Sequence, residues 1–510
     1  MKTKKTKNLI DFFKTGVIYL LTTSMLMTAG LYINARQHAG QSEGIPWEKM
    51  RIFEIGGMAK AEINENHITP LQITITADGT AFTAVYSDKS VLDIYEYAIK
   101  NSIRDIFGKN SECRLLEKKE GDELWAKCAG LDRSVYIKYA GNYVYPFIYI
   151  FLDKQWDIKN SADDFSNELA MVHELFIIDD GGGASGVARD IYGRVSLFSP
   201  AAEIKNKIRQ RLTDAELSAY KNIAGVVPCD FLKSGEIGDE AGSGENSIKN
   251  LKFPESFHLF RNYDRYSFVL NFFNPLLGGD GKINADHAYI KNLLKTLNFN
   301  IENSASYPEG DGMTFKDGKN TIRFHDDGRI IYSSNENSGG VHLAKFLSYD
   351  DKYYTYYEKI KAASVFVGSL DRELTGNECK IYLKDVAINS KGNMDVIFSY
   401  YYEGVEIKIN GSNEAIVLTI NENSFTQITI NSLNITLSQQ GMVKNRNPVF
   451  DLNVIDNEIS NGRKEDIARK YNLNYDEASG KFVVGDFRLV YDINYIPDGD
   501  NTARAVWELR

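Results

Sequence analysis

The sequence has few of the residues that cross-link, stiffen or bind metals. It has 510 residues, among them four cysteines, ten prolines and seven histidines. Four cysteines in so long a chain exclude a small disulfide scaffold, and no Cys-x-x-Cys or Cys/His spacing indicates a zinc site. Ten prolines exclude a long, stiff proline-rich spacer. We therefore expect the body of the protein to be held together mainly by its hydrophobic core.

Motifs of known catalytic and nucleotide-binding sites are incomplete. His173 and Glu174 begin a zinc-protease pattern, but Ile177 stands where the second histidine ligand is required. The glycine-rich segment 179–186 lacks the spacing of a phosphate-binding loop and of the Gly-x-Ser-x-Gly motif. We interpret it as a surface turn. The acidic residues are too numerous for a glycosidase pair to be chosen from sequence.

Two further polar segments fit structural roles better than a metal site. Segment 280–286 has oxygen-bearing residues at alternate positions but lacks the glycine and the final glutamate of a calcium loop. We expect Asn284 to cap a helix there. Segment 325–328 contains Asp-Gly, which favours a hairpin turn. The sequence thus predicts no catalytic residue, no metal ligand, no cofactor and no enzyme activity.

A long apolar run lies near the N-terminus. Residues 15–33 are uncharged and mostly apolar, and they follow five lysines and one acid, Asp11. A helix of this length matches a bilayer core, and the positive flank predicts a cytoplasmic N-terminus. The alternative is a signal peptide cleaved after Ala35, although Ile33 is large for that site and the run is long. We favour an uncleaved anchor, with the body outside the cell.

The apolar run also has a seam of small residues. Gly16, Thr23 and Gly30 recur every seven residues. Small side chains on one helix face let a second membrane helix pack closely. We interpret Gly16, Thr23 and Gly30 as helix-packing residues, and the alternative is an ordinary lipid-facing anchor.

The body of the protein is acidic. The net charge is −10, and the first fourteen residues contribute +4 (five lysines, one aspartate), so the rest carries −14. Such a body is a poor binder of nucleic acid. We therefore expect no nucleic-acid partner.

Periodicity in the body indicates helices alternating with antiparallel strands. Helical spacing occurs at 90–106, 203–223, 283–297, 353–366 and 463–471. The strand-like segments that follow include 123–128, 134–139, 143–152, 312–315, 320–325, 329–333, 380–387, 394–402, 405–410, 415–420, 426–437 and 487–495. The predicted fold class is α+β, with an N-terminal transmembrane helix followed by several modules of a helix plus an antiparallel sheet.

Segment 234–247 is rich in glycine, serine and acids and reads as a linker. The predicted organisation is a cytoplasmic tail 1–14, a transmembrane helix 15–33, an N-terminal domain 36–233, a linker 234–250, a middle domain 251–348 and a C-terminal domain 349–510.

Cys113 and Cys128 flank a turn-like segment. They could form a disulfide bond across a hairpin. The alternative is two buried thiols.

Three strand patterns resemble a known family. The segment 395–407 is similar to a hairpin of the YycH and YycI proteins, in which a tyrosine-rich strand meets a Gly-Val/Ile strand. Segments 327–332 and 489–509 also resemble strand motifs of that family. The resemblance is clearest for residues 255–510 and, as architecture, for 1–35. It implies PepSY-like modules, no catalytic residues, and a single-pass regulator of the WalK/WalR two-component system in Gram-positive bacteria.

The resemblance predicts a membrane-anchored extracytoplasmic regulator of a sensor histidine kinase. Its membrane helix and its body would contact the kinase or a sister regulator in the membrane. The competing class is a cell-envelope enzyme or wall-binding module whose site has no known motif. A cleft with converging buried carboxylates would favour the enzyme, and a filled core would favour the regulator.

Overall fold

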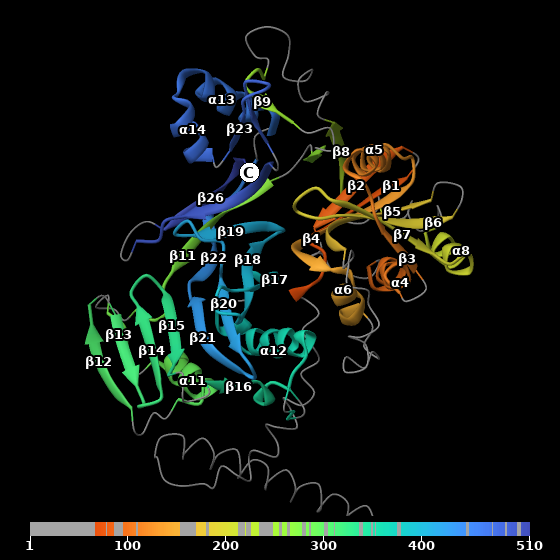
Figure 1. Cartoon of the computed structure of the whole chain (residues 1–510). Helices are drawn as coiled ribbons and strands as arrows, with labels where there is room; N and C mark the ends of the chain where they lie inside the picture. The colour runs from red at the N-terminus through yellow and green to blue at the C-terminus, as the bar shows by residue number, and fades with distance from the viewer. Residues whose placement is uncertain are drawn as a thin grey trace, which may run out of the picture. The chain divides into compact units, whose positions relative to one another are not determined.

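The architecture comes from a computed structural model, shown in Figure 1. The described residues are 67–77, 79–85, 95–108, 111–152, 170–179, 183–212, 220, 226–233, 248–253, 258–262, 266–277, 282–284, 287–299, 304–310, 312–335, 340–347, 350–351, 353–374, 379–444, 448–471, 473–484, 487–496 and 501–509. The predicted tail, transmembrane helix and linker segment 234–247 lie outside them.

The predicted fold class is wrong. Strands make up 46% of the structure and helices 27%, so the protein is mostly β-sheet. The strands also do not divide into small repeated modules, because they join into one sheet of nine strands, one of fourteen and a small one of three. The prediction failed because local periodicity identifies single strands but not the strands with which they pair. Among the described residues, no helix has both the length and the apolarity needed to cross a membrane.

The nine-stranded sheet is antiparallel and has the order β10-β8-β2-β1-β4-β5-β6-β7-β3. Its strands are β1 (Gln72–Ala77), β2 (Thr80–Val85), β3 (Ser111–Leu115), β4 (Ser134–Val144), β5 (Met171–Asp179), β6 (Ala184–Arg189), β7 (Val195–Pro200), β8 (Val227–Lys233) and β10 (His258–Asn262). β10 lies beyond the predicted linker in sequence but pairs with β8. The sheet therefore extends past the predicted boundary at residue 233.

The fourteen-stranded sheet has the order β12-β13-β14-β15-β21-β20-β18-β19-β25-β26-β11-β22, with β16 on β21 and β17 on β18. Its strands are β11 (Tyr266–Phe273), β12 (Ala305–Glu309), β13 (Gly312–Lys316), β14 (Asn320–His325), β15 (Arg329–Ser334), β16 (Val341–His342), β17 (Lys380–Ile388), β18 (Met394–Tyr402), β19 (Val405–Ile409), β20 (Ile416–Asn421), β21 (Ser424–Asn431), β22 (Asn434–Lys444), β25 (Phe487–Ile493) and β26 (Thr502–Leu509). β15 and β21 pair although they belong to different predicted domains. One sheet therefore includes strands of both the middle and the C-terminal segments.

A small lobe is inserted between β22 and β25. It contains helices α13 (Pro448–Asn461) and α14 (Lys464–Tyr471) and strands β23 (Asn474–Asp476) and β24 (Lys481–Val483), and β9 (Leu251–Lys252) pairs with β24 in parallel. The lobe has its own hydrophobic cluster, separate from the main core. The buried Asp456 carboxylate accepts hydrogen bonds from the backbone N–H groups of Lys249 and Asn250, at 3.0 and 2.7 Å. This contact holds the last residues of the predicted linker 234–250.

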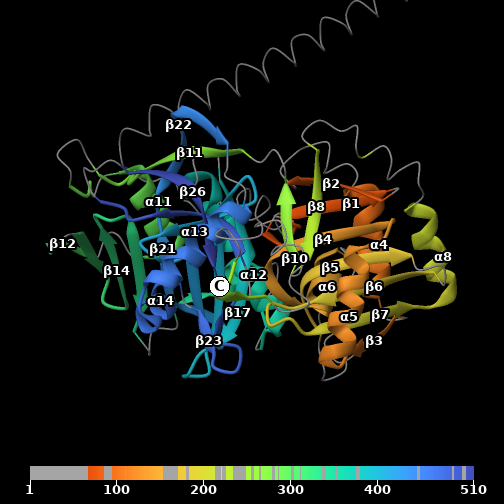
Figure 2. The same cartoon turned by 90° about the horizontal axis from the view of Figure 1, so that it is seen from above.

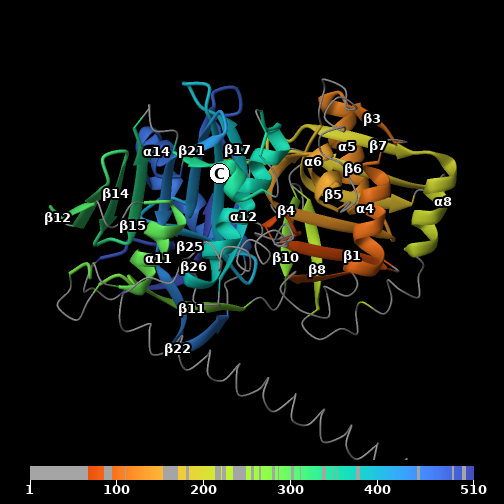
Figure 3. The ribbon, with the colours of Figure 1, turned by 90° about the horizontal axis from the view of Figure 1, so that it is seen from below.

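The remaining helices cover the faces of the two large sheets, and Figure 3 shows α11 and α12 over the fourteen-stranded one. They are α4 (Lys100–Ile106), α5 (Lys118–Ala129), α6 (Tyr145–Leu152), α8 (Ala202–Arg211), α11 (Ala288–Thr296) and α12 (Tyr356–Leu374), with short helical turns at η2 (Tyr95–Ile99) and η5 (Leu343–Lys345). α4 and α6 pack into the main core on one face of the nine-stranded sheet. α5 covers a separate cluster with Trp125 at its centre.

Helix α12 shows how sequence sets an element. Thr355 and Glu358 form a capping box, in which the Glu358 carboxylate accepts from the Thr355 N–H at 2.7 Å and the Thr355 hydroxyl from the Glu358 N–H at 3.3 Å. The helix therefore begins at Tyr356, three residues after the predicted start. Ile360, Ala363 and Val367 follow at helical spacing and are fully buried.

Two segments predicted as strands are helices. Segment 123–128 lies in α5, where Trp125 and Cys128 face the sheet three residues apart. Segment 143–152 contains the last two residues of β4 and then α6. Apolar residues on every side of α6 pack into the main core. A short apolar run does not separate a buried helix from a buried strand by periodicity, and here both alternatives fit the sequence.

Other local predictions are confirmed with shifted ends. Helices α11 and α14 lie within the segments predicted as helical, and α8 begins one residue before its predicted segment. Segment 325–328 forms the β14–β15 turn, with Gly328 at φ +86°. The predicted cap Asn284 is wrong, because the His287 side chain accepts from the Tyr289 N–H and caps α11 instead.

Candidate functional site

The most distinctive polar feature lies where the fourteen-stranded sheet forks. β18 and β19 form a hairpin whose two-residue turn, Glu403 and Gly404, has positive φ at both positions, as a type I′ turn requires. β19 pairs with β18 over two residues only and then runs parallel to β25. The other end of β18 pairs with β20. β18 is therefore shared at the fork, with β20 paired to one of its ends and β19 to the other.

Charged residues line one face of the sheet at this fork. In β19, Glu406 and Lys408 alternate with apolar residues that enter the main core. Because side chains alternate between faces along a strand, both charges lie on the face opposite that core. Arg488 of β25 lies directly opposite Glu508 of β26. The strand register therefore brings these charges together from three neighbouring strands.

A fifth charge comes from β17, through a β-bulge. The pairing of β17 with β18 shifts between Leu383 and Asp385, which leaves Lys384 as the extra residue. Bulges re-aim a side chain and occur often beside functional sites. At this bulge the Lys384 ammonium contacts the Glu406 carboxylate.

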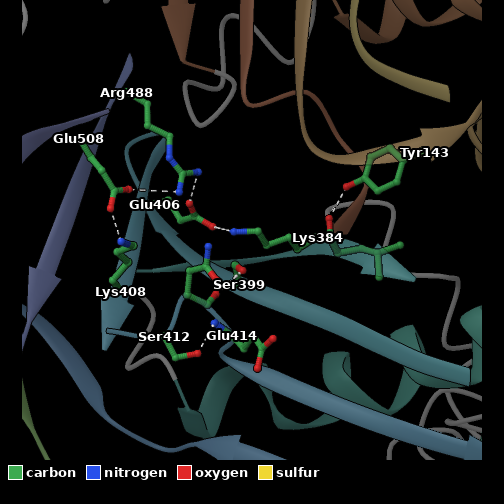
Figure 4. Close-up of polar contacts among 11 residues, drawn as sticks. Tyr143, Lys384, Ser399, Glu406, Lys408, Ser412, Glu414, Arg488 and Glu508 are labelled. Carbon is green, nitrogen blue, oxygen red and sulfur yellow. Dashed lines mark hydrogen bonds and ion pairs between the residues drawn. The ribbon is translucent and has the colours of Figure 1, made fainter. Parts of the chain in front are cut away.

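We call Lys384, Glu406, Lys408, Arg488 and Glu508 the Glu406 network (Figure 4). Glu406 contacts Lys384 through Oε1 and Arg488 through Oε2. Glu508 contacts Lys408 through Oε1, and its Oε2 lies 3.5 Å from Arg488 Nη2. All four carboxylate oxygens are engaged. The network alternates in sign along its length and carries three cations against two anions.

The network is withdrawn from solvent. The Glu406 side chain is 2% exposed, and those of Lys384 and Arg488 are 18% exposed. Removing one partner of a buried ion pair strongly destabilises a protein, because it leaves a buried charge unmatched. With both oxygens of each carboxylate bound to cations, the network is suited to joining strands and not to carrying protons.

Tyrosines surround the network. Tyr401 of β18 lies opposite Glu406, and burial, together with the negative Glu406, raises the pKa of Tyr401 well above its ordinary value. Burial likewise raises the pKa values of Tyr143 and Tyr382. These phenols therefore stay protonated. The Tyr143 hydroxyl donates to the Leu383 carbonyl, next to the bulge.

This part of the fourteen-stranded sheet meets β4 of the nine-stranded sheet. Tyr382 and Tyr401 form a small apolar cluster with Leu71 and Ala140. Gly141 lies so close to the Lys384 carbonyl oxygen that any Cβ at this position would overlap it. The pairing of β4 with β5 is also irregular between Lys138 and Tyr143. Two irregular strand segments therefore meet backbone to backbone beside the network.

A second row of charges crosses the nine-stranded sheet. Lys138, Glu174 and Arg189 lie side by side on β4, β5 and β6. We call them the Glu174 row. Tyr136 donates to Glu174 at 2.5 Å, and Arg189 Nε lies 3.6 Å from the same carboxylate. Burial alone would raise the pKa of Glu174, but the charges of Arg189, Lys138 and His173 and the hydrogen bond from Tyr136 lower it.

The structure places the predicted cysteine pair on opposite faces of the nine-stranded sheet. Cys113 of β3 packs against the main core, and Cys128 of α5 lies in the Trp125 cluster. Both are thiols and not a disulfide bond; Cys128 is buried, as the alternative had it, but Cys113 is half-buried. Burial raises the pKa of Cys113 to about 11. The predicted helix-packing residues Gly16, Thr23 and Gly30 lie outside the described residues.

Other residues considered from sequence take structural positions. His173 and Glu174 lie on a strand, not on the helix that a zinc-protease motif needs. Asp179 forms a two-point ion pair with Arg209 of α8, at 2.6 and 2.7 Å. Within the described ranges, no group of three or more His, Cys, Asp or Glu side chains is arranged to hold a metal ion.

The sequence predicted no member of the Glu406 network. One signal was present, since Glu406 and Lys408 alternate with Val405, Ile407 and Ile409 and so must share one face of a strand. Their partners could not be found in this way, because Arg488 and Glu508 lie more than seventy residues away. Comparisons with family models, with curated proteins and with solved structures give no match.

Proposed function

We propose that this protein is a membrane-anchored extracytoplasmic regulator of a sensor histidine kinase, of the YycH/YycI type. It acts by protein–protein contacts, through its N-terminal membrane helix and its body, on the kinase or on a sister regulator. It is not an enzyme. Regulation of this kind requires contacts that differ between two states of the kinase, because only a differential interaction shifts an equilibrium.

One observation carries the proposal. The segments that resemble the family lie far apart in sequence, yet they contribute β15, β18, β19, β25 and β26 to one sheet. Four of these are consecutive neighbours, since β18 pairs with β19, β19 with β25 and β25 with β26. The Glu406 network joins three of them to β17. A shared structural element supports the resemblance more than separate strand patterns would.

The membrane part of the proposal rests on sequence alone. Residues 15–33 and the preceding lysines predict a spanning helix with the body outside. A thiol introduced at Ser243, in the predicted linker, should react in intact cells with a reagent that does not cross membranes. Labelling only after lysis would overturn this topology.

Purification of the tagged full-length protein from membranes tests the partner. We expect a sensor histidine kinase among the bound proteins, and a change in the kinase's target genes when this protein is deleted. Replacing Gly16 and Gly30 together by Leu should keep the helix inserted but weaken helix pairing by ~1–2 kcal/mol. Recovery of no kinase from membranes that contain the intact protein would contradict the proposal.

A further inference from the structure

Strand β3 ends the nine-stranded sheet and offers a free edge, visible next to β7 in Figure 2. Among the described residues no strand pairs with its outer side. The Leu116 N–H donates to the Val195 carbonyl. Because hydrogen-bonded pairs alternate along an antiparallel ladder, the backbone groups that point towards β7 are those of Leu116, Arg114 and Glu112. The backbone groups of Cys113 and Leu115 therefore point outwards, to the side where none of the described strands pairs with β3.

Edges of this kind are usually blocked. β12, at one end of the fourteen-stranded sheet, carries Pro308, which has no N–H to offer to a further strand. β3 has no proline, and its Leu115 side chain is 56% exposed. An unblocked edge with an exposed apolar side chain is a template for strand addition.

The sequence of β3 is complementary to itself. In an antiparallel pair centred on Cys113, Glu112 of one strand lies opposite Arg114 of the other, and the arrangement occurs twice. Arg114 also binds Glu120 of its own chain, at 2.7 and 3.1 Å, so Glu112 of the second copy joins an ion pair that is already formed. The register also agrees with the backbone, since Cys113 and Leu115 then make the hydrogen-bonded pairs for which their groups point outwards. Opposite charges across strands stabilise pairing, and like charges oppose it.

A rigid apolar tip lies at the Leu115 end of the same edge. The turn from β6 to β7 exposes Tyr192 (75%) and Ile191 (55%), and Leu115 is opposite Ser196 just beyond it. The buried Asp190 carboxylate accepts from the N–H groups of Tyr192 and Arg194 at 2.9 and 2.8 Å. The backbone of the turn is thus preorganised, so it loses little freedom on contact.

We propose that β3 pairs with β3 of a second copy of this chain, antiparallel and centred on Cys113, to form a symmetric dimer. The two nine-stranded sheets become one continuous sheet across a twofold axis, and Ile191 and Tyr192 extend the contact beyond the strands. The interface is self-complementary, as a twofold dimer requires. This inference goes beyond the proposed function and does not depend on it.

A charge swap in the full-length protein tests the dimer. In a Glu120→Gln background, which removes the intrachain carboxylate partner of Arg114, Glu112→Arg and Arg114→Glu each place like charges opposite each other twice. Each should raise the dimer dissociation constant by about tenfold or more. In the same background the double variant Glu112→Arg/Arg114→Glu restores opposite charges and should return to within about threefold of Glu120→Gln alone. Analytical ultracentrifugation in detergent gives the constants, and circular dichroism melting checks the fold.

Two further variants make the result decisive. Lys207→Glu reverses an exposed charge on α8, away from this edge, and should leave the dimer unchanged. Leu115→Pro removes an outward N–H and should abolish the dimer while the chain stays folded. A monomeric wild type, single variants that associate as the wild type does, or a folded double variant as weak as the single ones would each overturn the proposal.

Discussion

The Glu174 row and the Glu406 network both place alternating charges across neighbouring strands, but they are assembled differently. The Glu174 row uses β4, β5 and β6, which follow one another in the chain and are paired in that order. The Glu406 network uses β17, β19, β25 and β26, from residue 384 to residue 508, and includes a parallel pair and a bulge. The first row is a product of local topology. The second forms only when distant segments have come together.

The two also differ in surroundings. Glu174 and Arg189 are each 16% exposed, and Glu174 has a neutral donor in Tyr136 besides its cations. Glu406 is nearly inaccessible and contacts two cations. Loss of a carboxylate should therefore matter more in the network than in the row, because fewer other groups can compensate there.

The largest effect should come from Glu406→Gln. The change leaves Lys384 and Arg488 without the charge between them, and we expect a loss of roughly 3–5 kcal/mol in the free energy of unfolding. Urea denaturation measures it. Glu508→Gln is the matched control, since Glu508 is 26% exposed and should cost less. Equal losses of stability in the two variants would mean that the cost does not depend on how deeply the carboxylate is buried.

Gly141→Ala tests the place where the strands of the two charge systems meet. The added methyl group would overlap the Lys384 carbonyl, so β4 and β17 must move apart, at a cost of about 1–3 kcal/mol. Gly193→Ala is the comparison, because its added methyl group meets open space. This variant should lose only about 1 kcal/mol of stability, from the positive φ at that position. Thermal unfolding of both variants measures the difference. A Gly141 variant as stable as the wild type would show that this contact is not tight.

Glu174→Gln should be milder than Glu406→Gln. The amide still accepts the hydrogen bond from Tyr136, so the loss is that of a charge-assisted interaction, roughly 1–2 kcal/mol. The same denaturation experiment applies. If this variant loses more than Glu406→Gln, the ranking of the two charge systems is reversed.

The smallest effect concerns pH. The pKa of Glu174 is lower in the folded protein than in the unfolded chain, so folding favours its ionised form. Its contribution is therefore complete above the unfolded value, about pH 4.3, and declines as pH falls through the folded value. The stability difference between wild type and Glu174→Gln should be constant near neutral pH and shrink below about pH 4. A difference that grows on acidification would contradict this sign.

These contrasts explain how far sequence could predict the structure. Several helices and the Asp-Gly turn at 325–328 were found because their signals are local. Pairing of β15 with β21, or of β19 with β25, has no local signal, and this is why the fold class was predicted wrongly. The same reason applies to the site, since the alternation around Glu406 indicates a charged face but names no partner.

The failed strand predictions have a different cause. Segment 143–152 is apolar at nearly every position, so its composition satisfies a buried strand and a buried helix alike. The choice was made by tertiary packing, in which α6 packs against β4 and α4 in the main core.

The position of β26 affects how the protein reaches its native state. β26 is the last strand that the structure describes, yet it lies inside the fourteen-stranded sheet, between β25 and β11. A chain that emerges N-terminus first has made β11 and β19 long before β25 and β26 arrive to join them. Until then one edge of β19 and one edge of β11 stay unpaired, and the two parts of the sheet are not joined. The contact order of this sheet is therefore high, folding should be slow, and the newly made chain should depend on protection from aggregation until β26 has been synthesised.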